Sequence, residues 1–590
     1  MLETVSYIDQ ILIYLVFGLA ANLILGYTGV LQAAPAAFGA FGGYAVVYLT
    51  STHHWPWILA VIVGVAMALV AGFLIGLPAL YLSSLWVLLL TLAVGLVIDS
   101  ILSGVQTFGG DNGLQQSSSL DLFGFQLNEP TQVLPLAAVV AVIVLAVCWR
   151  IGESPYGRVL RGIRADDSAV YALGKNVYTY KLSMFVVTAG LSGLGGALLA
   201  TLTNVASPTE FNYTASVEII AIVIIGGVGN PFGTVIGSAI VVLLVPFFQD
   251  VIQVTPQTAA NIQLIGYGLV LALVVLFRPS GALPEGFTIS SVRSALSRRL
   301  SSGKQAKTPP ISEGAAERRR ARQAARNLER VGDPAPQGVV LDVRDVSKAF
   351  GGIKAVNELS MQLQGGKITA LIGANGAGKT TVFNLLTGAL SLDGGEVYLN
   401  GQNISGLRPD QIANLGMVRT FQDVRLFHGM TVLDNVLMGV PDQAGEHLVP
   451  LFVRIGKTRA REREAQAIAR RWLEFVGLED FADVRVEALG YGQQKLVSLA
   501  RILATDARVL LLDEPASGID YQFLDEMLDV ISQLRDEGRT VCIVEHNLDV
   551  VGRLADHVYF MEVGKVTAEG NITDLTSDER LAEVYFGGGS

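Results

Sequence analysis

The sequence predicts a multi-domain protein, in which an all-α polytopic membrane domain is followed by an α/β domain. The distribution of charge is the first observation: no Lys or Arg precedes Arg150, none lies between Lys181 and Arg278, and charges are frequent afterwards. The second is a set of apolar runs in the first half that are long enough to cross a bilayer. The third is a β-rich run at 367–374, followed by a glycine loop and a helical run at 379–390.

Composition excludes several other classes of protein. The 590 residues include two cysteines, Cys148 and Cys542, one in each half, which rules out a disulfide framework and a multi-cysteine metal site. The net charge of −10 comes with no basic aromatic pattern, so we expect no nucleic-acid partner. The first ten residues lack the basic region of a cleaved signal peptide, so we expect the first apolar run to be retained as a span.

We expect about eight crossings within residues 1–278. Seven apolar runs have a suitable length, at 8–26, 30–50, 56–79, 81–102, 132–149, 182–202 and 259–277. An eighth, 217–247, is interrupted by GGVGNPFG at 226–233, which predicts two short spans or a re-entrant pair. All Lys and Arg of this half lie in 150–181 or at 278, so the positive-inside rule places both regions in the cytoplasm. The loops 51–55 and 103–131 and the N-terminus then face outward.

Four features of the membrane half each allow two interpretations. The small residues of 26–44 serve close helix packing, or they line a substrate path. Glu218 is functional or paired if it lies inside a span, and means little at the interface. Asp99 is nearer the end of a span, which favours the interface. The loop 107–114 is a flexible outward loop and a candidate docking surface.

The glycine loop in the second half predicts a phosphate-binding site. Its stretch IGANGAGKTT contains GxxxxGK[ST], between a strand and a helix. The glycines let backbone amides turn towards phosphate oxygens, and the helix N-terminus adds a partial positive charge. The loop therefore predicts that Lys379 reaches the terminal phosphates of a bound nucleotide and that Thr380 can ligate Mg²⁺. The expected nucleotide-binding residues of the loop are Gly373, Asn375, Gly376, Ala377, Gly378, Lys379, Thr380 and Thr381.

Two later strands supply the other expected catalytic groups. The run RVLLLDEP at 508–515 predicts a buried strand that ends in Asp513 and Glu514. Asp513 would hold Mg²⁺ and Glu514 would polarise the attacking water. The run 539–550 predicts another strand, which ends at His546. A histidine at a strand end is more often structural, but this order of motifs places it near the γ-phosphate.

With these motifs in place, residues 338–590 resemble the nucleotide-binding domain of ABC transporters, an α/β P-loop ATPase with a helical subdomain. The resemblance implies that Phe350 stacks on adenine, although a core Phe remains the alternative. It implies that Gln422 contacts Mg²⁺ and senses the membrane domain, and that His546 is the switch histidine. The signature loop is LGYGQQ at 489–494, and the D-loop is 517–520, with Asp520 as its acidic residue.

The signature loop departs from the common LSGGQ. Gly490 replaces the serine and Tyr491 replaces a glycine, whereas Gly492 and Gln493 match. The serine hydroxyl that normally contacts a γ-phosphate is therefore missing. Because two such domains sandwich ATP in this family, we expect any weakening to affect the partner's nucleotide.

Further residues narrow the resemblance to branched-chain amino-acid importers. RLFHGMTVLDNVLMG, the helical insert with RERE and WLEFVGLEDFA, and the tail RLAEVYFGG are similar to the LivG-type ATPase. Asn22, GYTG before AAFGAFGGY, the segment 154–182, SVEIIAIVIIGGVGNPFGTVIGS and FRPSG are similar to the LivM-type permease. The amphipathic segment 150–181 could be a basic membrane-surface helix. The resemblance gives it the coupling role instead, docked beside Gln422.

The sequence thus predicts an ATPase that drives import of leucine, isoleucine and valine as a permease–ATPase fusion subunit. The expected domains are a multi-pass permease at 1–278 in the cytoplasmic membrane, a basic flexible linker at 279–337 and a cytoplasmic ATP-binding domain at 338–590. Contact of the linker with anionic lipid is the alternative to a free tether. The resemblance implies a second permease, a second ATPase and an extracytoplasmic substrate-binding protein as partners, besides membrane lipid.

Three alternatives remain open at this point. Importers of urea or short amides share these sequence features, and the sequence does not separate them. An exporter half-transporter would need long helices with charged cytoplasmic extensions, and residues 1–149 have no basic charge. A membrane-anchored signalling ATPase would not need a span broken at 226–233.

Overall fold

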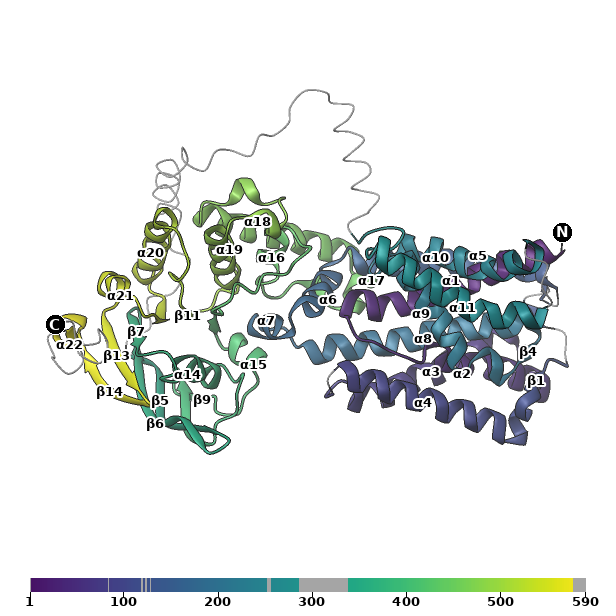
Figure 1. The fold of residues 1–590 in the computed structure, drawn as a ribbon, viewed down its shortest axis with the longest axis horizontal. Coiled ribbons are helices and arrows are strands. Elements are labelled where there is room, and N and C mark those ends of the chain that lie inside the picture. Colours follow the sequence, from purple (N-terminus) through teal and green to yellow (C-terminus); the bar gives the residue numbers. More distant parts are fainter. Residues whose placement is uncertain are drawn as a thin grey trace, which may run out of the picture. The chain divides into compact units, whose positions relative to one another are not determined.

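The computed structural model describes residues 2–82, 84–117, 120–122, 125–127, 129–251, 256–285 and 338–576. Most of the expected linker and the tail RLAEVYFGG lie outside the described residues. The chain divides into two compact units, labelled along the chain in Figure 1. Residues 1–164 and 177–306 form what we call the helical unit, and residues 165–176 and 307–590 form the α/β unit.

The helical unit is built almost entirely from helices. Six of its described helices are long and apolar enough to cross a membrane, and α10 and α11 contribute shorter apolar stretches, 231–244 and 265–274. The main helices are α1 Leu2–Thr28, α2 Pro35–His53, α3 Trp57–Ala79, α4 Ser84–Gly104, α5 Pro130–Gly152, α6 Pro155–Ala165, α8 Val177–Thr203, α9 Tyr213–Gly226, α10 Pro231–Val251 and α11 Pro256–Phe277. The predicted polytopic all-α fold is confirmed.

Helix α2, which covers most of the predicted span 30–50, is not among those six. It is rich in Gly and Ala, and most of its side chains are buried. A Cβ added at Gly42 would collide with the backbone of Gly193 on α8, and one added at Gly196 would collide with Gly39. Its small residues therefore allow close approach of two backbones, which supports the packing interpretation of 26–44.

The predicted interruption at 226–233 separates α9 from α10. Gly227 and Gly229 have φ values of 121° and 82°, which favour glycine. The opened backbone is bound by Asn22 of α1, whose Nδ2 donates to Asn230 O at 3.0 Å and whose Oδ1 accepts from Gly229 N at 2.8 Å. A side chain thus replaces the hydrogen bonds that a continuous helix would make, as apolar surroundings require.

The other loops of the helical unit contain short 3-10 turns and two-residue strands. The loop 107–114, predicted to be flexible, contains two 3-10 turns and one strand that pairs with residues 205–206. The short elements are η1 Gln106–Phe108, η2 Gly110–Asn112, β1 Leu114–Gln115, β2 Asp121–Leu122, β3 Phe125–Gln126, β4 Val205–Ala206 and η3 Pro208–Glu210.

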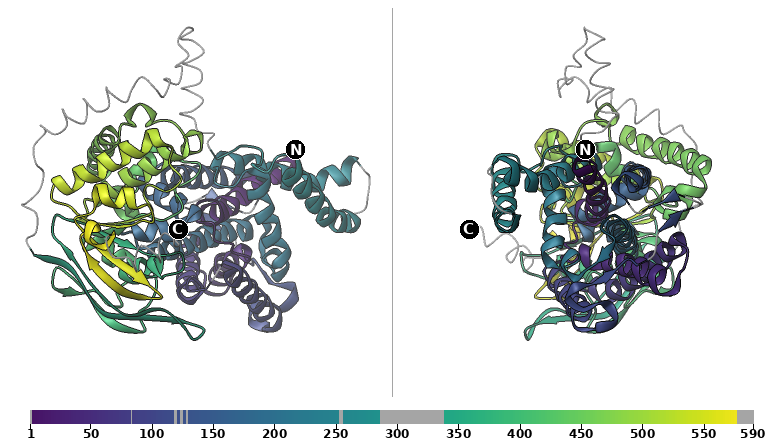
Figure 2. Two further views of the ribbon diagram at one scale, coloured as in Figure 1. Left: turned by 60° about the vertical axis from the view of Figure 1, so that its left-hand side comes forward. Right: turned by 90° about the vertical axis from the view of Figure 1, so that its right-hand side faces the viewer.

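The α/β unit contains two main sheets, seen from further directions in Figure 2. The larger has the strand order β10-β11-β12-β7-β13-β14 and is parallel except for the last pair. The smaller, β6-β5-β8-β9, is antiparallel. The strands are β5 Val339–Phe350, β6 Ile353–Gln364, β7 Ile368–Ile372, β8 Gly394–Leu399, β9 Gln402–Asn403, β10 Met417–Arg419, β11 Val509–Asp513, β12 Thr540–Val544, β13 His557–Glu562 and β14 Lys565–Gly570.

Strands β7, β11 and β12 are adjacent and buried along their whole lengths. Their continuous apolar runs fit a parallel sheet covered on both faces. Helices α16, α18 and α19 pack on one another as the helical subdomain. The helices of this unit are α7 Asp167–Ala172, α14 Lys379–Leu386, α15 Pro409–Asn414, α16 Val432–Leu437, α17 Leu448–Val453, α18 Ile455–Phe475, α19 Tyr491–Leu503, α20 Tyr521–Asp536, α21 Leu548–Leu554 and α22 Ile572–Thr576.

Candidate functional site

The glycine loop connects buried strand β7 to α14. Gly376 and Gly378 have φ values of 83° and 106°, and a Cβ at Gly378 would collide with Ala355 O of β6. The loop therefore needs glycine for conformation and for space. Lys379, the first residue of α14, donates to Gly373 O at 2.8 Å and Ala374 O at 3.0 Å. The Lys379 ammonium thus contacts the glycine loop, beside which it is expected to bind phosphate.

Asp513 ends β11 and lies next to the helix that begins at Lys379. It is 2% exposed, and among the described residues neither carboxylate oxygen accepts a hydrogen bond. Loss of solvation raises the pKa of Asp513 to about 6, and the positive charge of Arg419 opposes that rise. Two bare carboxylate oxygens in a buried site fit a hard cation such as Mg²⁺.

Glu514, Gln422 and His546 meet at the end of the sheet, although they come from three separate segments. Gln422 Nε2 donates to Glu514 Oε2 at 3.2 Å, and His546 Nδ1 lies 4.0 Å from Glu514 Oε1. Glu514 has a φ of 46°, an uncommon conformation for a residue with a side chain. The parallel register of β11 and β12 pairs Asp513 with Val544, two residues before His546, which explains the convergence.

Lys495 was not predicted as a site residue. It is buried on α19, and its Nζ donates to Glu514 O and to Ser517 O, both at 2.7 Å. Burial lowers the pKa of Lys495, while Glu545 and Glu514 oppose the shift. Lys495 therefore joins the helix of the signature loop to the backbone that carries Glu514. It directly follows LGYGQQ, but the sequence does not show which carbonyls it binds.

Glu545 is a second residue that sequence reasoning missed. Its side chain is fully buried, and Oε1 accepts from Ala516 N at 2.9 Å. Burial raises the pKa of Glu545. Glu545 follows β12 and Ala516 follows β11, so this hydrogen bond joins the loops after the two strands. His546, the next residue, is held in place with them.

The signature and D-loop residues lie around α19 and α20. Gly490 is the N-cap of α19, and its N–H donates to Gln493 Oε1 at 3.1 Å. Tyr491 is 46% exposed, with Lys495 Nζ 5.5 Å from its ring centroid. Gly492 faces Phe523 of α20 closely enough that a Cβ would crowd the ring. Asp520 is the N-cap of α20.

Phe350 lies at the end of β5, before a two-glycine turn into β6. Its side chain is 47% exposed, and Lys348 Nζ lies 5.8 Å from the ring centroid. An exposed ring excludes the alternative that Phe350 is a core residue. The ring is therefore accessible to solvent, as stacking on a planar ligand group would require.

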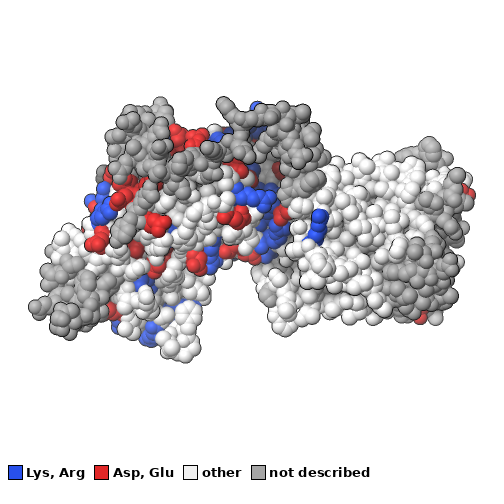
Figure 3. All heavy atoms as spheres, turned by 45° about the horizontal axis from the view of Figure 1, so that its top comes forward, with Lys and Arg blue, Asp and Glu red and all other residues white. Residues whose placement is uncertain are grey.

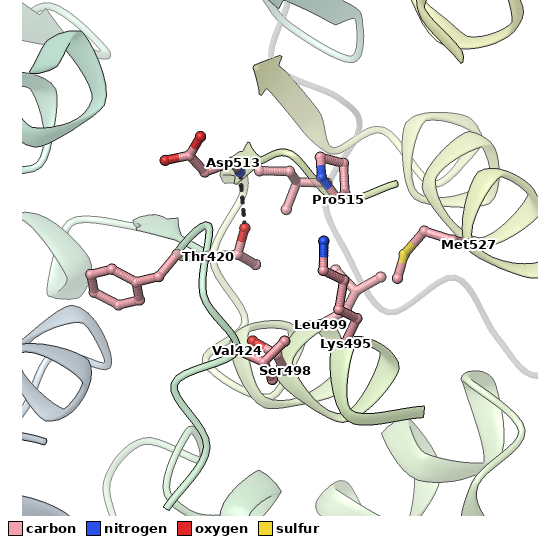
Figure 4. A pocket seen from close by; sticks show the side chains of 10 residues that line it. Thr420, Val424, Lys495, Ser498, Leu499, Asp513, Pro515 and Met527 are labelled. Atoms are coloured by element: carbon pink, nitrogen blue, oxygen red, sulfur yellow. Dashed lines mark hydrogen bonds between the residues drawn. The ribbon is translucent and has the colours of Figure 1, made fainter. Parts of the chain in front are cut away.

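A pocket lies beside these residues but is not the phosphate cradle (Figure 4). It is lined by Thr420, Phe421 and Val424 and by residues of β11, α19 and α20. Thr420 Oγ1 accepts from Asp513 N at 3.0 Å, the dashed line in the figure. The Asp513 carboxylate itself points away from Lys495 and Met527.

Residues 165–176 belong to the α/β unit although they come from the membrane half of the sequence. Asp166 caps α7 by accepting from Ala169 N at 3.0 Å, and Arg425 NH1 lies 3.4 Å from its other oxygen. Asn414 Nδ2 donates to Gly174 O at 3.1 Å. Arg425 is three residues after Gln422, so this segment contacts the same loop whose Gln422 contacts Glu514.

The helical unit contains a paired acid. Glu218 of α9 lies within the candidate span 208–226, and Tyr14 of α1 donates to its Oε2 at 3.4 Å. Its position in a candidate span and its contact with Tyr14 favour the paired interpretation over the interfacial one. The face of this unit in Figure 3 is almost free of charged side chains, whereas the α/β unit carries both signs.

The fold and the site together define the class of protein, which is an ATP-binding cassette joined in one chain to a polytopic membrane domain. Residues 4–277 match the family model of a branched-chain amino acid transport system permease component, and residues 356–517 match the ABC transporter model.

Similar proteins cover the second half. The ATP-binding protein BraF of Pseudomonas aeruginosa is 37% identical over 249 residues, 42% of this chain and 98% of BraF. LivG of Escherichia coli K12 is 36% identical over the same shares. Both are described as high-affinity branched-chain amino acid transport ATP-binding proteins. A solved nucleotide-free ATP-binding cassette from an ABC transporter is 34% identical, covering 42% of this chain and 99% of its own, with a TM-score of 0.38.

The chain therefore belongs to the ABC transporter family, as a branched-chain amino acid transport permease component fused to an ATPase homologous to LivG and BraF. It is a multi-pass membrane protein whose cytoplasmic cassette binds nucleotide and hydrolyses ATP in connection with transport. Other subunits of such a system are implied.

Proposed function

We propose that this chain is the permease–ATPase fusion subunit of an importer for leucine, isoleucine and valine in the cytoplasmic membrane. The observation that carries the proposal is the agreement of two unconnected regions. The first half matches a permease component and the second half matches ATPases of one transport system. We assign the permease to 1–278, the linker to 279–337 and the ATP-binding domain to 338–590.

In the proposed mechanism, the glycine loop from Gly373 to Thr381 binds the phosphates of ATP and Phe350 stacks on adenine. Thr380, Gln422 and Asp513 would hold Mg²⁺, which would supply positive charge against the phosphates. Support for the cation comes from the bare, buried carboxylate of Asp513.

Hydrolysis is assigned to the cluster at the end of the sheet. Glu514 accepts the proton of the attacking water, and His546 contacts the γ-phosphate. Gln422 donates a hydrogen bond to the Glu514 carboxylate. A change at Glu514 would therefore shift Gln422 and, with it, residues 423–425. Lys495 of α19, the helix of the signature loop, donates to the backbone carbonyl of Glu514. Movement of α19 would therefore move Glu514, the proposed base.

The cassette is expected to work as a pair. Gly490, Tyr491, Gly492, Gln493 and Asp520 would then face the ATP of a second ATPase subunit. Without the serine hydroxyl, backbone amides at the start of α19 are left to bind that γ-phosphate. A second permease and an extracytoplasmic binding protein complete the proposed machine.

Coupling is assigned to the segment 150–181. Its residues 165–176 belong to the α/β unit. They are preceded in the chain by α6 and followed by α8, which both belong largely to the helical unit. Closure of two cassettes on ATP would therefore pull on helices of the permease through one continuous stretch of backbone.

The test is uptake in cells that express the chain with its neighbouring genes. Labelled leucine and labelled urea are supplied separately, beside the Glu514→Gln variant. The proposal expects leucine uptake that the variant loses. Urea uptake alone would replace the substrate and keep the mechanism, and the absence of both signals would overturn the import proposal.

A further inference from the structure

The short helix α17 and the residues after it form an unusual surface on the α/β unit. We call residues 448–459 the α17 surface. Val449 and Val453 are 73% and 75% exposed, and Phe452 and Ile455 are 38% and 41% exposed. Leu451, between them, is 2% exposed and faces the unit. Helix α17 is thus attached through Leu451, while three of its large apolar side chains and Ile455 at the start of α18 face outward.

The charge of the same stretch has one sign. Residues 448–459 contain three cations, Arg454, Lys457 and Arg459, and no acidic residue. All three are exposed. Apolar side chains followed by cations are typical of elements that lie in a membrane interface, where the cations meet lipid phosphates.

The base of α17 is fixed to the part of the chain that enters the membrane. Glu446, two residues before α17, is hydrogen-bonded to Lys175 at 2.6 Å, and both side chains are buried. Lys175 is two residues before Val177, which begins α8, a candidate membrane span. Since α17 itself is only about 9 Å long, its exposed residues are attached close to Lys175, which precedes this candidate span along the chain.

We infer that the α17 surface inserts its apolar side chains among the headgroups of the cytoplasmic leaflet and binds anionic phospholipid through its cations. Burial of four large apolar side chains in the interface removes surface from water that the described α/β unit leaves exposed. The inference assigns a lipid contact to the cassette, and it does not depend on the substrate or on the direction of transport.

A labelling experiment tests the contact on the full chain in nanodiscs. Both native cysteines are buried, so Val453→Cys provides one reactive site for an environment-sensitive fluorophore. Val563→Cys is the matched control, because Val563 is an 85% exposed valine elsewhere on the same unit. We expect spin-labelled lipid headgroups to quench the label at 453 several-fold more than at 563, and more strongly with phosphatidylglycerol than with phosphatidylcholine alone.

A second pair of variants tests the cations. Lys457→Gln with Arg459→Gln removes two charges, and Lys367→Gln with Lys565→Gln removes two exposed charges elsewhere. The first pair should weaken the lipid contact roughly tenfold or more, and the control pair should leave it unchanged. Equal quenching at 453 and 563 would overturn the inference. So would protection of the label only after other transporter subunits are added, whatever the lipid.

Discussion

Lys175 and Glu446 form a buried ion pair inside the α/β unit, although they are 271 residues apart in sequence. The ammonium lies 2.6 Å from one carboxylate oxygen and 2.8 Å from the other, and both side chains are less than a tenth exposed. Nζ also donates to Val440 O at 3.2 Å. This contact anchors residues from the membrane half of the chain on the helical subdomain side of the cassette.

Removal of Lys175 should therefore uncouple transport from ATP hydrolysis. Lys175→Ala leaves the Glu446 carboxylate buried without its partner, which costs about 3–5 kcal/mol in comparable pairs. We expect residues 165–176 to detach, so that uptake falls while nucleotide binding stays near its normal affinity. The measurement compares uptake with ATPase activity in proteoliposomes.

Two controls separate the ion pair from general damage. Lys367→Ala, at an exposed position, should leave uptake and ATPase activity unchanged. Lys175→Met with Glu446→Leu replaces the pair by apolar groups and should restore docking better than Lys175→Ala alone. Unchanged uptake in Lys175→Ala would show that coupling runs through another surface.

Lys379 gives a prediction about binding alone. Lys379→Ala removes the ammonium that lies against Gly373 O and Ala374 O, and with it the charge expected to meet the terminal phosphates. Because hydrogen bonds to charged groups are worth about 1.5–3 kcal/mol, nucleotide affinity should fall by roughly 10- to 100-fold or more. Equilibrium binding of a fluorescent ATP analogue measures this. An affinity equal to wild type would remove Lys379 from the phosphate site.

These residues also show which parts of the site were visible in the sequence. The glycine loop, Asp513 and Glu514 were predicted because each lies directly after a buried strand, and the ends of neighbouring parallel strands meet. Lys495 and Glu545 were missed because their roles depend on carbonyl and amide groups of other loops. No local pattern indicates such partners.

The fold shows the same limit. Apolar runs predicted the polytopic helical unit, and GGVGNPFG predicted the break between α9 and α10. Close helix packing was one of the two interpretations of the small residues at 26–44, and the Gly and Ala residues of α2 do pack against α8 at backbone distance. The pairing of Lys175 with Glu446 could not be predicted, because no sequence motif connects two residues that lie 271 positions apart.

Glu514 should be needed for turnover and not for binding. Glu514→Gln keeps the size of the side chain and removes the base, so ATP should bind normally while hydrolysis falls by roughly 10²- to 10⁴-fold. Phosphate release from proteoliposomes provides the rate. Glu537→Gln, at an exposed position after α20, serves as the charge-matched control. Normal turnover in Glu514→Gln would assign the proton transfer to another group.

Asn22 should stabilise the interrupted helix pair. Its side chain bonds Gly229 N, Asn230 O and, at 2.8 Å, Thr234 Oγ1. Asn22→Leu removes the partner of Gly229 N, at a cost of about 1–3 kcal/mol for that buried group, whereas Asn230 O still accepts from Thr234 N and Thr234 Oγ1. We expect a lower melting temperature of the detergent-solubilised protein. An exposed apolar replacement on another candidate span, Ile62→Leu, should have little effect, and equal melting of both variants would contradict the role of Asn22.

Asp513 should make the stability of the nucleotide-free cassette fall as pH rises. Its pKa is raised from 3.8 to about 6, so the folded state binds the proton more tightly than the unfolded state. Stability from this group is present below about pH 4 and is lost as pH rises through about 6. Asp513→Asn removes the dependence, and it should therefore stabilise the protein at pH 7.5 by about 1–3 kcal/mol without Mg²⁺ and have little effect at pH 4.5. Melting curves at both pH values in EDTA measure the difference. Added Mg²⁺ and ATP should reverse the order at pH 7.5, because the cation binds the carboxylate and not the amide; a variant that is equally stabilised at both pH values would contradict the buried, bare carboxylate as the cause.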